Sequence, residues 1–177
     1  MAQEQFYIRR AVRQDTEAIR KILNYYIANT NMSWSHSLHR PRDTARIYRS
    51  HQFSDRTPLL VSELNGEVIG FAALSFVSNN DGWQEVCEEM IYIHPEYVGR
   101  GAGRGLLDAV MEQGFRAGLF AVLAKIDAEN EMSLKFHKSF GFEEYGRLKD
   151  VGIKGGKRRS CVNLVHYYYD PEKPNFL

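Results

Sequence analysis

The stretch from Glu88 to Gly105, E-E-M-I-Y-I-H-P-E-Y-V-G-R-G-A-G-R-G, limits most strongly what this chain can fold into. It reads as a strand that ends at His94-Pro95, followed by a glycine-rich turn and a helix. Four glycines within seven residues suit neither a strand nor a helix interior, because each has more conformational entropy to lose on folding. Glycines fit where a backbone approaches a ligand closely, and N–H groups at the start of a helix attract anions. The stretch therefore predicts a loop that binds the pyrophosphate of a nucleotide-like cofactor.

Length and composition indicate one soluble domain over residues 1–177. The chain is 44% hydrophobic and 25% charged, which is typical of globular proteins. A net charge of +1 gives no bulk attraction to nucleic acid or to an anionic membrane. The N-terminus lacks an apolar signal region and no run reaches the length of a membrane span, so we expect a cytoplasmic protein without nucleic-acid or membrane partners. Cys87 and Cys161 lie in apolar runs without metal-ligand spacing, so we expect two small buried residues and no metal site.

Hydrophobic periodicity predicts a mixed α/β (α+β) chain. Helices are expected at 15–27, 41–51, 106–118 and 132–140, and strands at 6–12, 59–63, 67–77, 83–94, 121–126, 142–148 and 160–169. Asn65-Gly66 is a strong hairpin signal, while Asn130 and Gly141 suit the start and the end of the last helix. The basic run from Lys154 to Arg159 fits a solvated turn. The order of elements predicts a mixed sheet with helices on its faces rather than repeated βαβ units.

Two familiar glycine patterns are excluded by spacing. The dinucleotide-binding pattern G-x-G-x-x-G fails from both possible starts, because Arg104 and Leu106 stand where its third glycine belongs. The P-loop requires Gly-Lys followed by Ser or Thr, and Arg158 follows Gly156-Lys157.

The turn instead resembles the coenzyme A loop of the GNAT N-acetyltransferase superfamily, usually written Q/R-x-x-G-x-G/A. Gly101 and Gly103 occupy its glycine positions, and Val98 stands where Gln or Arg is expected. Backbone amides make most of the pyrophosphate contacts in that superfamily. The segment from Ile126 to Phe142 is similar to the second cofactor segment, with Asn130 at the start of its helix.

More closely, the chain resembles the phosphinothricin/methionine sulfoximine acetyltransferase family over nearly its whole length. The stretches that carry this resemblance are N-T-N-M-S-W ending at Trp34, E-x-x-x-Y-I-H-P, the glycine loop, I-D-A-E-N, F-H-K-x-x-G-F and G-R-L-x-x-V-G-x-K. The resemblance implies the GNAT fold, with a central, mostly antiparallel sheet and helices on both faces, acetyl-CoA as co-substrate, and a homodimer. It also implies a cofactor site formed by Ile91, Tyr92, Ile93, Gly99, Arg100, Gly101, Ala102, Gly103, Arg104 and Asn130.

Acetyl transfer from a thioester to an amine requires an unprotonated amine. Because free ammonium groups have pKa values of about 8 to 10, a general base is needed at neutral pH. The resemblance assigns this role to Glu88, which shares a strand face with Met90, although the adjacent Glu89 leaves the assignment open. It also implies a role for His137, which either protonates the departing thiolate or only positions it. The resemblance further implies that backbone N–H groups near 91–93 stabilise the developing oxyanion.

On the substrate side the chain departs from the family. Members that acetylate amino acids usually carry an aromatic-Arg-Pro motif and a second arginine, but Val77-Ser78-Asn79 and Gln84 stand at those places. A guanidinium orients a carboxylate through a bidentate ion pair. Either a basic residue of the 154–159 run replaces the arginines, or the enzyme accepts another amine. The residues expected to contact the substrate are Trp34, Ser78, Trp83 and Lys154.

The sequence thus predicts an N-acetyltransferase for a small-molecule amine, with an amino acid or a toxic analogue such as phosphinothricin or methionine sulfoximine as substrate. Two alternatives remain open at this point. One is acetylation of a protein or a polyamine, and the other is a GNAT-fold module that binds coenzyme A without catalysis.

Overall fold

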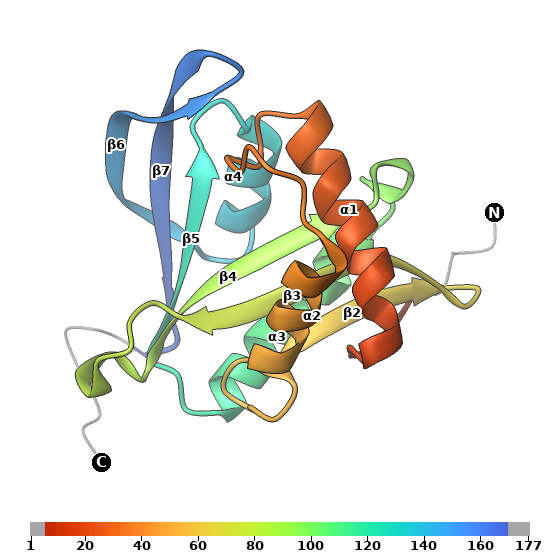
Figure 1. The fold of residues 1–177 in the computed structure, drawn as a ribbon. Coiled ribbons are helices and arrows are strands. Elements are labelled where there is room, and N and C mark those ends of the chain that lie inside the picture. Colours follow the sequence, from red (N-terminus) through yellow and green to blue (C-terminus); the bar gives the residue numbers. More distant parts are fainter. Residues whose placement is uncertain (1–5, 170–177) are drawn as a thin grey trace.

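One seven-stranded sheet forms the framework of the computed structural model, which describes residues 6–169 (Figure 1). The strands are β1 (Tyr7–Arg10), β2 (Leu59–Leu64), β3 (Glu67–Phe76), β4 (Val86–Ile93), β5 (Ala121–Asp127), β6 (Glu143–Lys154) and β7 (Lys157–Tyr167). Their order in the sheet is β1-β2-β3-β4-β5-β7-β6. Every neighbouring pair is antiparallel except β4 and β5, which are parallel. The predicted mixed, mostly antiparallel sheet is confirmed.

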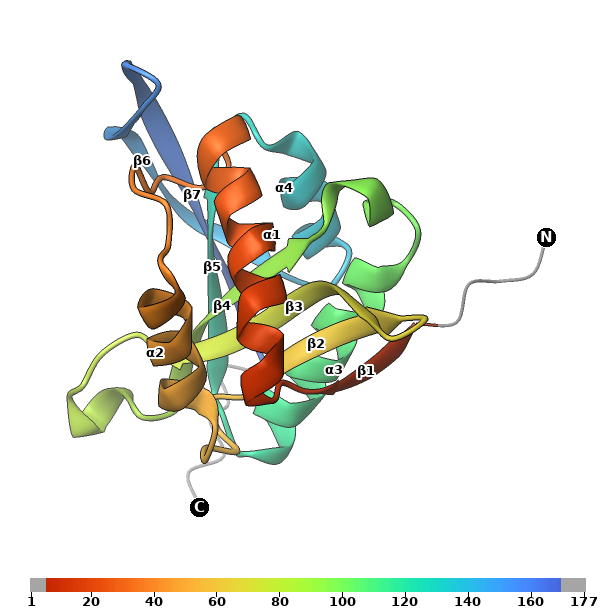
Figure 2. The same ribbon diagram turned by 45° about the vertical axis from the view of Figure 1, so that its right-hand side comes forward.

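Helices cover both faces of this sheet, as predicted (Figure 2). Within residues 6–169 the α-helices are α1 (Thr16–Asn29), α2 (Pro41–His51), α3 (Ala102–Arg116) and α4 (Glu131–Lys138). The apolar stripe of α1, which includes Ile19 and Ile22, packs with Phe71 of β3 on one face. On the other face, Leu106 and Val110 of α3 pack in a larger cluster with β2, β3, β4, β5 and β7. The helical period of these apolar residues is what predicts each helix, and burial of the stripe is what stabilises it.

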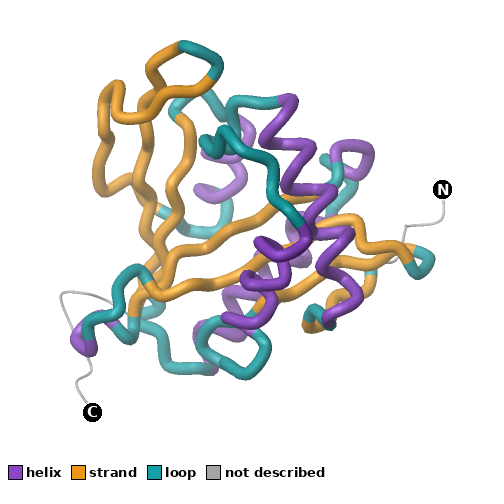
Figure 3. Tube along the Cα trace, in the orientation of Figure 1, coloured by secondary structure: helices purple, strands orange, loops and turns teal. Residues whose placement is uncertain are grey.

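The parallel pair in the middle of the sheet separates after a short contact. The ladder between β4 and β5 runs only from Val86 opposite Ala121 to Glu88 opposite Leu123. Beyond these residues the strands diverge, so the sheet opens toward α4 (Figures 1 and 3). This opening determines where a ligand can bind.

Two local predictions are wrong. The strand expected to end at Leu148 continues to Lys154, and β7 begins already at Lys157. Gly155 and Gly156, with φ of 58° and 75°, form the exposed two-residue turn between them, whereas Lys154 and Arg159 at the ends of the basic run are buried. The strand expected from Trp83 starts only at Val86, because Asp81–Trp83 forms a 3-10 turn.

Other local predictions are confirmed. Asn65 and Gly66 have φ of 51° and 83° and connect β2 to β3 as a tight hairpin. The side chain of Asn130 caps α4 by accepting a hydrogen bond from the N–H of Ser133. Both cysteines are buried and free. Within the described part of the chain, no helix has both the length and the apolar character needed to cross a membrane.

Candidate active site

A cleft of about 530 Å³ lies where β4 and β5 separate. This volume is within the usual range for small-molecule sites. Its walls come from β4, the glycine loop, α3, β5, α4, α1 and the segment between α1 and α2. The residues that line it are Tyr26, Met32, Glu88, Glu89, Met90, Ile91, Tyr92, Ile93, Val98, Gly99, Gly101, Gly103, Arg104, Lys125, Ile126, Asp127, Asn130, Met132, Ser133, Phe136 and His137.

The glycine loop brings the N-terminus of α3 to one end of the cleft. Gly99 and Gly101 have φ of 81° and 99°. A residue with a Cβ atom is strained in this left-handed region, so both positions favour glycine. Gly101 is the N-cap of α3, and the first turn of this helix contains no acidic side chain. The N–H groups of this turn have no partner within the helix and carry the positive end of its dipole. This end of the cleft therefore suits an anionic group.

An open strand edge forms the middle of the cleft. The N–H of His94 donates to the carbonyl of Ile69, and the N–H of Val77 donates to the carbonyl of Val86. Because hydrogen-bonded residues alternate along an antiparallel pair, the peptide groups of the even-numbered residues of β4 face β3. The peptide groups of Ile91 and Ile93 consequently point toward β5, beyond the end of the β4–β5 ladder. The hydroxyl of Tyr26 donates to the carbonyl of Ile93 at 2.7 Å. The edge offers backbone hydrogen-bonding groups to an extended ligand that carries amides.

Adjacent glutamates of β4 lie on opposite faces of the sheet. Glu88 is on the side of α1 and α2, together with Met90, whereas Glu89 is on the side of α3 and α4, together with Ile91. The Oε2 atom of Glu88 lies 2.6 Å from Nζ of Lys125 on β5. Their side chains are 33% and 52% exposed, so this ion pair is accessible from the cleft.

Glu89 forms a buried pair with His137 of α4. Its Oε1 lies 2.9 Å from Nε2 of His137, a residue that is only 1% exposed. The Nδ1 atom of His137 lies 2.8 Å from the carbonyl of Ser133, so Nδ1 carries a proton and a second proton is shared between Nε2 and Glu89. Burial lowers the pKa of His137, but the hydrogen bond and the charge of Glu89 outweigh burial and raise it. The other oxygen of Glu89, Oε2, is buried without a partner among the described residues.

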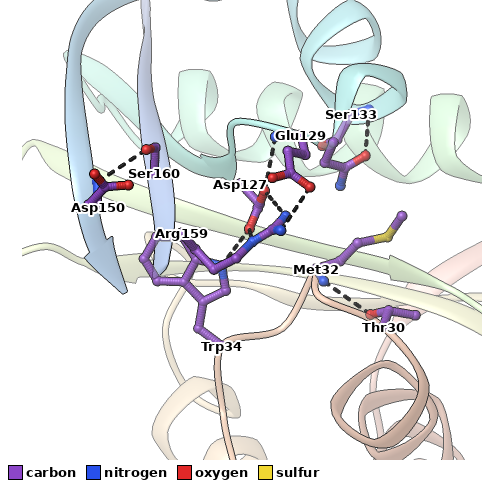
Figure 4. Close-up of polar contacts among 10 residues, drawn as sticks. Thr30, Met32, Trp34, Asp127, Glu129, Ser133, Asp150, Arg159 and Ser160 are labelled. Atoms are coloured by element: carbon purple, nitrogen blue, oxygen red, sulfur yellow. Dashed lines mark hydrogen bonds and ion pairs between the residues drawn. The ribbon is translucent and has the colours of Figure 1, made fainter. Parts of the chain in front are cut away.

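Asp127, at the end of β5, is the centre of a third polar group (Figure 4). Nε and Nη2 of Arg159 donate to its two oxygens at 2.8 and 2.6 Å, and Nε1 of Trp34 donates to Oδ2 at 3.0 Å. Arg159 also reaches Glu129, at 2.8 Å. Burial raises the pKa of Asp127, whereas the hydrogen bonds from Arg159, the Glu129 backbone and Trp34 lower it, and the net direction is down. Asp127 is an ionised, fully engaged carboxylate that ties β5 to the segment between α1 and α2.

Comparison with known proteins identifies this arrangement. Residues 19–142 match the model of the Acetyltransferase (GNAT) family. The chain belongs to the GNAT acetyltransferase family. It is 32% identical over 150 residues to an L-methionine sulfoximine/L-methionine sulfone acetyltransferase of Salmonella typhimurium, covering 85% of this chain and 87% of the relative. It is also 32% identical over 154 residues to the L-amino acid N-acyltransferase MnaT of Escherichia coli, with the same coverage.

A solved structure confirms the fold. The yncA protein of Salmonella typhimurium, solved with its cofactor acetyl-CoA, superposes with a TM-score of 0.90 at 29% identity, covering 97% of this chain and 98% of that chain. The predicted family and fold are confirmed, and the chain is an acetyl-CoA-dependent N-acetyltransferase.

The GNAT cleft contains most of the positions predicted to bind the cofactor. Ile91, Tyr92, Ile93, Gly99, Gly101, Gly103, Arg104 and Asn130 line it, as do Glu88 and His137. Two predicted positions do not line it. Ala102 is buried at the start of α3, and the guanidinium of Arg100 lies over the ring of Tyr97.

The residues predicted to contact the substrate lie outside the lining of this GNAT cleft. Trp34 does not line the cleft but donates a hydrogen bond to Asp127, which does. Lys154 is buried, and its ammonium donates to the carbonyls of Ile27 and Ser35, because the β6–β7 hairpin reaches back to α1. Trp83 belongs to the exposed 3-10 turn before β4, and Ser78 precedes that turn.

Sequence reasoning missed Tyr26, Met32, Lys125 and Asp127 as lining residues, and it missed Glu89 as the partner of His137. Asp127 lies within the recognised cofactor segment, but no spacing rule pairs it with a residue as remote as Arg159. No group of three or more His, Cys, Asp or Glu side chains suited to a metal ion is present in residues 6–169.

Proposed function

We propose that this enzyme transfers an acetyl group to the α-amine of a small amino acid or a toxic amino-acid analogue. The observation that carries the proposal is the Glu88 carboxylate, which lies on the α1–α2 face of the cleft, beside the open edge of β4. The activities of the Salmonella typhimurium and Escherichia coli relatives, on methionine sulfoximine or sulfone and on L-amino acids, support this substrate class.

The residues of the cleft fit acetyl-CoA, which supplies the acetyl group as a reactive thioester. The bare N-terminus of α3 and the side chain of Arg104 suit its pyrophosphate. The peptide groups of Ile91 and the N–H of Ile93, which lie beyond the β4–β5 ladder, suit the amides of its extended arm. One of these N–H groups would also donate a hydrogen bond to the thioester carbonyl, where negative charge develops during transfer.

Glu88 is proposed to act as the general base. It takes a proton from the substrate ammonium, directly or through a water molecule, so that the nitrogen lone pair becomes available. Met90 lies on the same face of β4 as Glu88, and Tyr26, Met32 and Met90 all belong to the lining of the cleft. A carboxylate on the opposite face, such as Glu89, is already committed to His137.

His137 and Glu89 are proposed to serve the leaving group. Their shared proton lies in the cleft wall on the α3–α4 side, with Oε2 of Glu89 left unpartnered there. For this, the Nε2–H of His137 would turn from Oε1 of Glu89 to the departing sulfur, and it would either protonate that sulfur or only position it through a hydrogen bond. We further propose that the enzyme is a cytoplasmic homodimer, on the strength of the family resemblance.

The test combines an acceptor panel with a base variant. We expect release of free coenzyme A thiol with L-methionine sulfone, L-methionine sulfoximine or phosphinothricin, and much less with spermidine or a peptide that begins with alanine. Glu88→Gln should lower kcat by about 10²–10⁴-fold, the usual contribution of a general base. It should retain the rise in melting temperature that acetyl-CoA binding causes.

Glu85→Gln is the matched control, because Glu85 is an exposed glutamate just before the same strand. It should leave turnover unchanged. Unchanged turnover of Glu88→Gln would remove Glu88 from the mechanism, and turnover of spermidine or the peptide alone would replace the proposed substrate class.

A further inference from the structure

Lys125 places a positive charge beside the candidate base. Its Nζ donates to Oε2 of Glu88 at 2.6 Å, and both side chains line the cleft. An ammonium group can donate three hydrogen bonds. Within residues 6–169, the ammonium of Lys125 donates one, to Glu88. The Lys125 side chain is 52% exposed, so its remaining donors are accessible to a ligand.

The other basic side chains near the cleft are committed elsewhere. Arg159 is bound to Asp127 and Glu129, and Lys154 donates to two backbone carbonyls. Arg104 lines the far end, at the start of α3, with its guanidinium over the ring of Phe140. The described residues that line the cleft include one arginine, Arg104, and one lysine, Lys125. Lys125 is therefore the basic side chain that can meet a substrate carboxylate at the end of the cleft where Glu88 lies.

We propose that Lys125 binds the carboxylate of the substrate, and that the substrate is a zwitterionic α-amino acid. This inference rests on the proposed function and specifies how its acceptor is recognised. In the free enzyme Glu88 and Lys125 neutralise each other. In the complex the substrate ammonium faces Glu88 and the substrate carboxylate faces Lys125, so that four charges alternate in sign.

The arrangement also prepares the base. When the substrate carboxylate draws Lys125 away, Oε2 of Glu88 becomes free to accept the proton from the substrate nitrogen. That proton ends on Glu88, and Lys125 neither gains nor loses a proton or a covalent bond. The hydrogen bond to Glu88 raises the pKa of Lys125, so its ammonium remains charged at neutral pH.

The same charges select against other amines. A polyamine brings additional positive charge next to Lys125, and the carboxylates of Asp127 and Glu89 already have partners. A peptide N-terminus has no α-carboxylate, so it leaves Lys125 without an acceptor. Because charges interact more strongly in a cleft from which water is displaced, these differences affect the choice of substrate.

The experiment compares L-methionine sulfone with its α-carboxamide, which keeps the amine and loses the negative charge. The measured quantity is kcat/KM for the acid divided by kcat/KM for the amide. Lys125→Met should lower this ratio by about ten- to a hundred-fold, the usual value of a charge-assisted hydrogen bond. Lys125→Arg should largely retain it. An unchanged ratio in Lys125→Met, even with lower activity on both acceptors, would overturn the proposal.

A control and a binding measurement complete the test. Lys21→Met removes a charge from an exposed position on α1 and should leave the ratio unchanged. The amine-free carboxylate 4-(methylsulfonyl)butanoate should bind at least tenfold more weakly to Lys125→Met than to the wild type by calorimetry. Equal binding would also overturn the proposal. If the wild type acetylates neither the acid nor the amide, the proposed function fails, and the binding measurement alone decides the role of Lys125.

Discussion

Glu88 and Glu89 are neighbours in the chain with opposite environments. Strand alternation places Glu88 on a partly open face with the long, flexible Lys125, and Glu89 in a closed wall with His137. The first carboxylate can exchange its partner for a ligand. The second one cannot lose its partner without leaving a buried charge, which costs several kcal/mol. One residue of spacing thus separates a carboxylate that is open to a ligand from one that is held in a buried pair.

The Glu89–His137 pair predicts a pH-dependent contribution to stability. The pKa of His137 is raised in the folded protein above its ordinary value of 6.5. The contribution of the pair is therefore fully present below about pH 6.5 and is lost as the pH rises through the raised pKa. Replacing His137 with Gln should cost about 1–3 kcal/mol at pH 6, and this cost should shrink by pH 9. Urea unfolding of both proteins across this range measures it.

An exposed histidine serves as the control. His36→Gln, in the segment between α1 and α2, should change the unfolding free energy little at either pH. If the cost of His137→Gln is the same at pH 6 and pH 9, the pair does not hold the proton assigned to it.

At this scale the sequence predicts the residues that local geometry determines. Gly99, Gly101 and Asn130 stand where turn and cap geometry require them. The partners of Glu88 and Glu89 could not be predicted, because Lys125 and His137 are 37 and 48 residues away. Their contacts exist only once β5 and α4 are in place, and no local periodicity encodes them.

The segment between α1 and α2 forms one wall of the cleft, and it is held at several points. The side chain of Asn24 bonds to both backbone groups of His39, and Lys154 donates to Ser35. The ring of Trp34 packs against Gly152 of β6, where there is no room for a side chain. This wall is therefore a fixed element, positioned by the β6–β7 hairpin.

Gly152→Ala should displace this wall. The added Cβ would lie 2.7 Å from the ring of Trp34, so Trp34 must move and weaken its hydrogen bond to Asp127. Overpacking of this kind costs about 1–3 kcal/mol. We expect the KM for the amine to rise several-fold while the KM for acetyl-CoA stays near its wild-type value. Steady-state kinetics with each substrate varied in turn measures both.

Gly146→Ala is the matched control on the same strand, because a Cβ there meets no atom within 4 Å. It should leave both KM values unchanged. Equal effects of the two substitutions, or a change confined to the KM for acetyl-CoA, would show that the wall does not set the amine site.

Local sequence patterns predict some of the helices and hairpins of this protein but not the length of the β6–β7 hairpin. The amphipathic helices and the Asn65-Gly66 hairpin follow from local periodicity and turn chemistry. The long β6–β7 hairpin was missed because its exposed apolar and basic residues do not alternate cleanly. Lys154 was expected at the substrate as a replacement for the absent arginines, but the hairpin turns its side chain toward α1, where it donates to the carbonyl of Ile27.

At the scale of the whole molecule, the split between β4 and β5 gives the enzyme two working faces. The N-terminus of α3 and the Glu89–His137 pair lie on one face, and the Glu88–Lys125 pair lies on the other. Element order alone predicts the sheet and its helices. It does not predict the split, which depends on how far the two strands stay paired. The two substrates can thus approach the reacting atoms from opposite sides of the sheet.

Strand β6 is the exposed edge of this sheet and carries an apolar surface. Within the described residues it pairs only with β7. Tyr145, Leu148, Val151 and Ile153 are 49–53% exposed along its length. Long edges with exposed apolar side chains are usually covered in native proteins. Together with the family resemblance, this favours a second copy of the chain as the cover.

We therefore expect the wild type to sediment at twice the chain mass of 20.4 kDa. The double substitution of Leu148 and Val151 by Lys should shift it to the monomer, because buried lysines at a two-fold interface repel each other. Phe53→Lys, at a 91% exposed position between α2 and β2, should leave the mass unchanged. A monomeric wild type at micromolar concentration would refute the dimer, and a double variant that stays dimeric would move the interface away from β6.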